Sequence, residues 1–98
     1  MHTQRARQTS VETTVRVRLT VRYFAAARAA AGAEAETVLI APGTTVAALV
    51  ETLSVRGPEL AQVLRRCSFL CDGVAVRDEG LNLSDGQTID VLPPFAGG

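Results

Sequence analysis

Residues 15 to 23 alternate between apolar and polar side chains along the printed sequence. The apolar positions are Val15, Val17, Leu19, Val21 and Tyr23. Because successive side chains of a strand point to opposite faces, this period of two predicts a β-strand with one buried face and one arginine-rich face. Phe24 follows and places an aromatic ring on the polar face.

A short helix and a second strand are predicted next. The segment from Ala25 to Ala31 is rich in alanine and precedes Gly32, which is typical of a helix that ends at a glycine. Apolar residues between Glu36 and Ala41 predict a strand, and Pro42-Gly43 predicts a turn after it.

Two further helices are predicted between residues 44 and 67. Thr44 or Thr45 can cap the first, and Pro58 suits the first turn of the second. Each has apolar residues at positions i, i+3, i+4 and i+7, which form one helical face. They are Val46, Leu49, Val50 and Leu53 in the first helix and Leu60, Val63, Leu64 and Cys67 in the second. Arg65 and Arg66 would lie near the C-terminus of the second helix, where cations are favoured.

The last third of the chain predicts a hairpin and a final strand. Apolar runs at 69–71 and 74–76 flank Asp72-Gly73, a strong hairpin signal, and Asp85-Gly86 indicates another turn. The strand from Thr88 to Leu92 would end at Pro93-Pro94, because proline cannot donate to a sheet ladder. This order of elements predicts an α+β domain, with a mixed sheet and helix packed on one face.

Three regions are therefore expected along the chain. Residues 1–14 are polar and terminal, which predicts a disordered lead-in. Residues 15–92 form the domain, since 98 residues suffice for only one. Residues 93–98 form a flexible C-terminal tail that ends in Gly97-Gly98.

Charge and composition exclude several classes of function. Ten basic and ten acidic residues give zero formal net charge, which argues against a nucleic-acid or acidic-membrane surface. No apolar run approaches the roughly 20 residues of a membrane span, and residues 1–14 lack the apolar core of a secretory signal. A cytoplasmic location is expected, with reduced thiols at Cys67 and Cys71.

No metal site or acid–base pair is predicted. Two cysteines cannot complete a four-ligand zinc site, and both are expected to pack as small hydrophobic residues. His2 has no evident partner, and Asp85 and Asp90 have the pattern of turn and surface residues. The remaining chemical candidate is the Gly98 carboxylate, which adenylation can activate and which two glycines can carry into a narrow channel.

The sequence resembles the ubiquitin-like β-grasp sulfur carriers of the MoaD/ThiS family. The resemblance covers about residues 15–98 and is strongest to MoaD, the small subunits of molybdopterin synthase. It rests on the start 21–25 (VRYFA) followed by an Ala/Arg helix, on the stretch 83–89 (LSDGQTI), and on the ending Pro93-Pro94-Phe95-Ala96-Gly97-Gly98. Asp72 stands where family members often carry Asn, and both tolerate the left-handed turn conformation.

The resemblance implies a carrier subunit rather than a self-sufficient enzyme. An E1-like, MoeB-like adenylyltransferase would use ATP to adenylate Gly98, and a sulfur donor would displace AMP to leave a thiocarboxylate. A MoaE-like large subunit would catalyse sulfur transfer to the pterin precursor. The domain itself would bind no cofactor and no metal.

Several residues are candidates for binding these partners. Phe24 and Leu92 would form an exposed apolar patch at the root of the tail, amid Arg18 and Arg22, because the first and last strands of a β-grasp sheet are neighbours. Arg28 in the Ala/Arg helix is a further candidate by resemblance. In the tail, Pro93 and Pro94 would form a stiff spacer, and Phe95 and Ala96 would lie in a partner groove, with Gly97 passing into the channel.

Two alternatives remain open. A sulfur carrier for thiamine or cysteine synthesis would also end in Gly-Gly. A β-grasp interaction module with an inert tail, for example one that binds RNA, belongs to another class, although zero net charge weighs against RNA.

Overall fold

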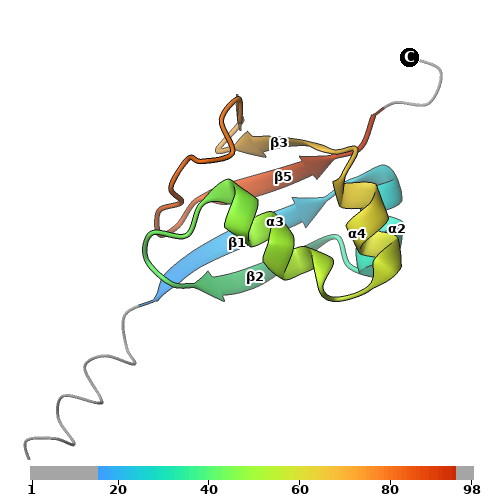
Figure 1. The fold of residues 1–98 in the computed structure, drawn as a ribbon, viewed down its shortest axis with the longest axis horizontal. Helices are drawn as coiled ribbons and strands as arrows, with labels where there is room; N and C mark the ends of the chain where they lie inside the picture. The colour runs from blue at the N-terminus through green and yellow to red at the C-terminus, as the bar shows by residue number, and fades with distance from the viewer. Residues whose placement is uncertain (1–15, 95–98) are drawn as a thin grey trace, which may run out of the picture.

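Residues 16–94 are the part of the chain that the computed structural model describes, and they form five strands and three helices (Figure 1). In chain order these are β1 (Val17–Tyr23), α2 (Ala25–Ala31), β2 (Ala35–Ile40), α3 (Val46–Ser54), α4 (Pro58–Leu64), β3 (Ser68–Cys71), β4 (Val74–Ala75) and β5 (Thr88–Leu92). The predicted lead-in, residues 1–14, lies outside the described residues.

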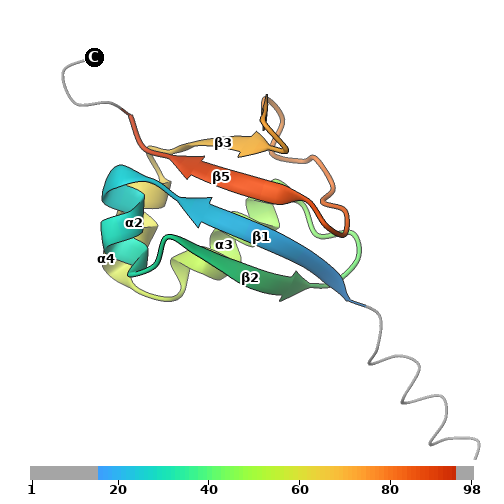
Figure 2. The same ribbon diagram turned by 180° about the vertical axis from the view of Figure 1, so that it is seen from behind.

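The five strands form one mixed sheet in the order β2-β1-β5-β3-β4. Strands β1 and β5 are parallel, and the other neighbouring strands are antiparallel. Helix α3 crosses one face of the sheet, while α2 and α4 pack together at the end where β5 finishes (Figure 1). No helix of the described chain covers the opposite face, called here the open face (Figure 2). The predicted α+β architecture is confirmed.

The alternation in β1 places its apolar side chains in the core, as predicted. Leu19, Val21 and Tyr23 are almost completely buried, and the residues between them are exposed. The helices contribute the other layer of the core through the apolar faces predicted from their spacing. The other buried hydrophobic residues of the described chain are Ala27, Val38, Ile40, Val46, Leu49, Leu53, Leu60, Leu64, Phe69, Cys71, Leu83, Ile89 and Val91.

Two local predictions are confirmed in detail. Asp72 and Gly73 both have positive φ angles, 50° and 84°, as a tight two-residue hairpin turn requires. The Asp72 carboxylate also accepts a hydrogen bond from the Thr88 backbone N–H at 2.9 Å, which ties the turn to β5. At the start of α3, the Thr45 hydroxyl accepts from the Ala48 N–H at 3.1 Å and caps the helix.

The prediction that the second long helix reaches Cys67 is wrong. Helix α4 ends at Leu64. After it, the backbone N–H groups of Arg66 and Cys67 donate to the carbonyls of Val63 and Leu64, three residues earlier, in a tighter turn. The chain has to reverse before Ser68, which enters β3, so the helical spacing ends earlier than the apolar pattern suggests.

Candidate functional site

The C-terminal tail leaves the sheet from β5, which lies between β1 and β3. Leu92, the last residue of β5, pairs with Ser68 of β3, and the neighbouring Val91 carbonyl accepts a hydrogen bond from the Phe24 N–H at 3.2 Å. Pro93 is half-buried and Pro94 is exposed. The root of the tail is therefore held on both sides by neighbouring chain segments.

The tail residues that carry the predicted chemistry lie outside the described residues. They are Phe95, Ala96, Gly97 and Gly98. Their predicted roles in partner binding and in sulfur transfer stay predictions, as does the contact predicted for Arg28. Arg28 itself is exposed on α2, near the same end of the molecule.

Phe24 and Leu92 lie at the root of the tail, but both are half-buried rather than exposed. Phe24 is the residue that precedes α2 and has an extended backbone. The Arg22 guanidinium carbon lies 5.6 Å from the centroid of the Phe24 ring, in cation–π geometry. The arginine therefore covers part of the aromatic surface that the sequence predicted to be open.

Asp90 is not the surface residue that the sequence predicted. It lies on the open face, yet only 6% of it is exposed, because it forms a two-pronged ion pair with Arg22. The Arg22 Nε donates to Oδ1 at 2.6 Å and Nη2 donates to Oδ2 at 2.8 Å. This hydrogen-bonded pair raises the pKa of Arg22 above its ordinary value. Asp85 is in a turn as predicted, and its carboxylate accepts from the Arg18 N–H at 2.7 Å.

A second polar network, which the sequence reasoning missed, joins Tyr23, Glu36 and Arg56. The buried Tyr23 hydroxyl donates to the Glu36 carboxylate at 2.5 Å, and Arg56, from the connection between α3 and α4, donates to the same oxygen. Burial, and then the hydrogen bond to Glu36, raise the pKa of Tyr23 well above its ordinary value. The sequence contained a signal for this network, because Glu36 shares the inward face of its strand with Val38 and Ile40.

Glu36 makes the stability of the domain depend on pH. Burial alone would raise the pKa of Glu36, but the hydrogen bonds from Arg56 and Tyr23, with the Arg56 charge, outweigh burial and lower it below 4.5. A carboxylate with a depressed pKa stabilises the folded state above its unfolded pKa and loses that contribution as the pH falls through its folded pKa.

We therefore expect Glu36→Gln to lower the free energy of unfolding at pH 7 and to have a smaller effect at pH 3, a pH below the ordinary glutamate value of 4.5. Urea titrations of both proteins at the two pH values measure this difference. An equal loss of unfolding free energy at both pH values would contradict a depressed pKa for Glu36. Glu51→Gln, at an exposed position on α3, is the matched control.

The cysteines behave as packing residues. Cys71 is buried in the core, and Cys67 is partly buried against it, with its thiol directed to the Val63 carbonyl. Burial raises the pKa of both thiols, which lowers their thiolate fraction. Among residues 16–94 there is also no cluster of three side chains suited to hold a metal ion.

None of the helices between residues 16 and 94 is long and apolar enough to cross a membrane.

Comparison with known proteins gives a family match over most of the chain. The model of the ThiS family matches residues 21–98, which include the last four residues, 95–98. The molybdopterin synthase sulfur carrier subunit of Chlamydomonas reinhardtii is 29% identical over 83 residues, covering 84% of this chain and all of that protein.

Two solved structures illustrate the range of similar proteins. A putative molybdopterin converting factor, subunit 1, from Pyrococcus furiosus has a TM-score of 0.73 at 25% identity, covering 81% of this chain and 99% of that one. The small archaeal modifier protein 1 from Methanosarcina acetivorans has a TM-score of 0.69 at 27% identity, covering 85% and 98%. The architecture is thus that of the β-grasp proteins that the sequence resembles.

Proposed function

The chain belongs to the ThiS family of sulfur carriers, and on that premise we propose that it supplies sulfur for molybdopterin synthesis from a thiocarboxylate on Gly98. The observation that supports this choice most directly is its alignment, over the whole length of the relative, with a molybdopterin synthase sulfur carrier subunit. The Pro93-Pro94 sequence before Gly97-Gly98 agrees with the same assignment.

The chemistry follows from the poor reactivity of a carboxylate. An adenylyltransferase would join the Gly98 carboxylate to AMP from ATP and release pyrophosphate. A sulfur nucleophile would then attack the acyl carbon, and AMP would leave with the bonding electron pair. The product, a thiocarboxylate, is a better nucleophile than the original carboxylate. The carrier needs no cofactor of its own in this scheme.

The fold supports the scheme through the position of the tail. Strand β5 is hydrogen-bonded on both edges, so the six residues after Leu92 start from a fixed point. In a polyproline-like conformation six residues span about 15–20 Å, enough to enter a buried site in a partner. A large subunit of molybdopterin synthase would bind this tail and the surface around its root.

Intact-mass spectrometry tests the proposed function. The full chain is incubated with ATP, an E1-like adenylyltransferase and sulfide, and the product should gain the mass difference between one sulfur and one oxygen. It should then convert pterin precursor when the large subunit is added. Absence of the mass gain would contradict every carrier function. A mass gain without pterin conversion would instead favour the thiamine or cysteine pathway.

Phe24 provides a test of the surface at the tail root. Phe24→Ala should weaken binding to the large subunit by about tenfold, because half-buried aromatic residues beside arginine are frequent anchors of interfaces. Isothermal titration calorimetry measures the affinity. Val74→Ala, 69% exposed on β4, is the control and should bind like the parent chain. Equal affinities of the two variants for the large subunit would show that Phe24 does not contribute to this interface.

A second candidate is a protein modifier, favoured by the similarity to a small archaeal modifier protein. In that function the adenylated Gly98 would form an amide bond with an amine of a target protein. The chain contains no lysine, so self-modification on a lysine side chain is excluded within its own sequence. Mass spectrometry of trypsin-digested cell extracts would distinguish the candidates by detecting the C-terminal peptide 78–98, which follows the last arginine of the chain, joined through Gly98 to other proteins.

A further inference from the structure

A basic corner lies on the helical side of the molecule, next to the root of the tail. It consists of Gln62 on α4 with Arg65 and Arg66 just beyond the end of that helix. These residues and Val63 line a surface hollow of about 490 Å³. All three polar side chains are exposed, and neither arginine forms an ion pair with any carboxylate among residues 16–94.

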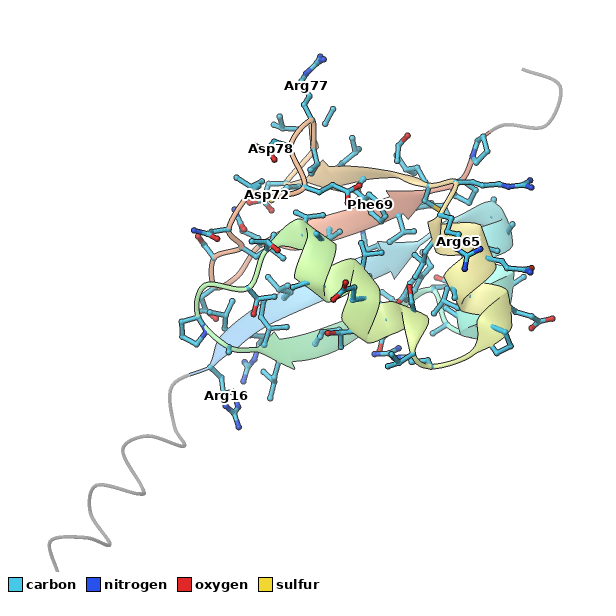
Figure 3. All side chains as sticks on the ribbon, viewed as in Figure 1. Arg16, Arg65, Phe69, Asp72, Arg77 and Asp78 are labelled. Atoms are coloured by element: carbon cyan, nitrogen blue, oxygen red, sulfur yellow. The ribbon has the colours of Figure 1, made fainter. Side chains whose placement is uncertain are left out.

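The pairing of β3 with β5 brings this corner close to the tail. Ser68 pairs with Leu92, and Arg66 precedes Ser68 by two residues while Pro94 follows Leu92 by two. Figure 3 shows Arg65 over α4, on the helical side and at the end where the chain leaves β5. The Arg22–Asp90 pair on β1 and β5 lies at the same end of the sheet, as does Phe24, which follows β1 and precedes α2. The tail therefore leaves with the basic corner beside it.

Two adjacent arginines that form no ion pair with any carboxylate among residues 16–94 favour an anionic partner. Like charges in sequence repel, and an opposing carboxylate removes that repulsion while accepting the two parallel hydrogen bonds that a guanidinium offers. Two acids lie near the corner without pairing with its arginines. Glu59, in the first turn of α4, lines an adjoining hollow with Gln62, and Glu51 of α3 lines another with Arg65. Because neither carboxylate reaches ion-pair distance, both guanidinium groups remain open to an anion from outside residues 16–94.

We propose that Gln62, Arg65 and Arg66 bind an acidic segment of the adenylyltransferase that takes the tail, a proposal that rests on the carrier function. An enzyme that encloses residues 95–98 has to lie against the surfaces around Pro94, and the basic corner is one of them. Exposed charges near an interface act mainly on the rate of association and on orientation. The corner would therefore direct the tail end of the carrier, rather than its other end, toward the enzyme.

A charge-reversal pair measures this contact. The Arg65→Glu/Arg66→Glu double variant is compared with Arg16→Glu/Arg77→Glu, which changes the charge equally but away from the end where the chain leaves β5 (Figure 3). Calorimetry with the adenylyltransferase at about 50 mM salt should show at least about tenfold weaker binding for the first variant and a change within about twofold for the second. At about 500 mM salt the difference should shrink. Equal affinities for the two double variants would overturn the proposal.

The terminal carboxylate of the same chain is the competing occupant of the corner. Amidation of Gly98 in the full-length chain removes the negative charge of the terminal carboxylate and keeps the length of the tail. If reversal of Arg65 and Arg66 still weakens binding of the amidated chain, the occupant belongs to the enzyme. If the effect disappears, the occupant is the chain's own carboxylate and the proposal is overturned.

The outcomes also separate this proposal from the carrier function. If the unmodified carrier gains sulfur but the two double variants bind the enzyme equally well, the proposal for the basic corner is overturned and the carrier function stands. If the unmodified carrier binds the enzyme and reversal of Arg65 and Arg66 weakens that binding, but the carrier gains no sulfur, only the carrier function is contradicted. Failure of the unmodified carrier to bind the enzyme at all overturns both.

Discussion

Removal of Gly98 should reduce thiocarboxylate formation by at least about a hundredfold while leaving the domain folded. A chain that ends at Gly97 still carries a carboxylate, but that group lies one residue, about 3.3–3.6 Å, short of the position it would take in the enzyme. Misplacement of a reacting group by about 1 Å already costs about a hundredfold in rate. Intact-mass spectrometry over time, with ATP, adenylyltransferase and sulfide, gives the rate.

The thermal midpoint should not change in this variant, because Val91 is the last buried hydrophobic residue of the described chain. Val74→Ala is the control and should acquire sulfur at the rate of the parent. If the shortened chain acquired sulfur as quickly as the parent, Gly98 would not be the carrier group. A lowered thermal midpoint would show instead that the tail contributes to folding.

Leu49→Ala should lower the free energy of unfolding by about 2–5 kcal/mol, the usual cost of removing a large buried side chain and leaving a cavity. Leu49 is 1% exposed and lies on the face of α3 that packs against the sheet. Domains of this size are stable by only about 5–15 kcal/mol in total, so this single change removes a large share of the stability. Urea unfolding followed by circular dichroism measures it.

The matched control is Leu39→Ala, because Leu39 is 55% exposed on β2. Surface substitutions of this kind usually change stability by less than about 0.5 kcal/mol. Similar losses for the two variants would contradict the assignment of α3 as the cover of the sheet. The comparison keeps the substitution constant while the burial of the leucine changes from almost complete to about half.

The sequence predicted those parts of the fold that depend on neighbours along the chain. The alternation of β1, the Thr45 cap and the Asp72-Gly73 turn each follow from a local pattern, and each is present. The position of the tail after β5 was predicted for the same reason. The end of α4 was not, because the apolar spacing continues to Cys67 while the path of the chain into β3 requires an earlier turn.

The details at the tail root depend on contacts between distant residues, and these could not be predicted. Arg22 and Asp90 are 68 residues apart in sequence, and only the parallel pairing of β1 with β5 brings them into register. The same arginine lies over Phe24, which makes the aromatic residue half-buried. Glu36 is the exception, because its inward position in the strand pattern already required a polar partner.

The place of β5 between two neighbours has a mechanical consequence. Any force that a partner exerts along the tail acts along the axis of β5, and therefore nearly perpendicular to its hydrogen bonds with β1 and β3. The two ladders are then loaded in shear, so their bonds have to break together rather than one at a time. The carrier can thus be drawn into and pulled out of an enzyme by its end, and the strand that bears the load is held by hydrogen bonds along both edges.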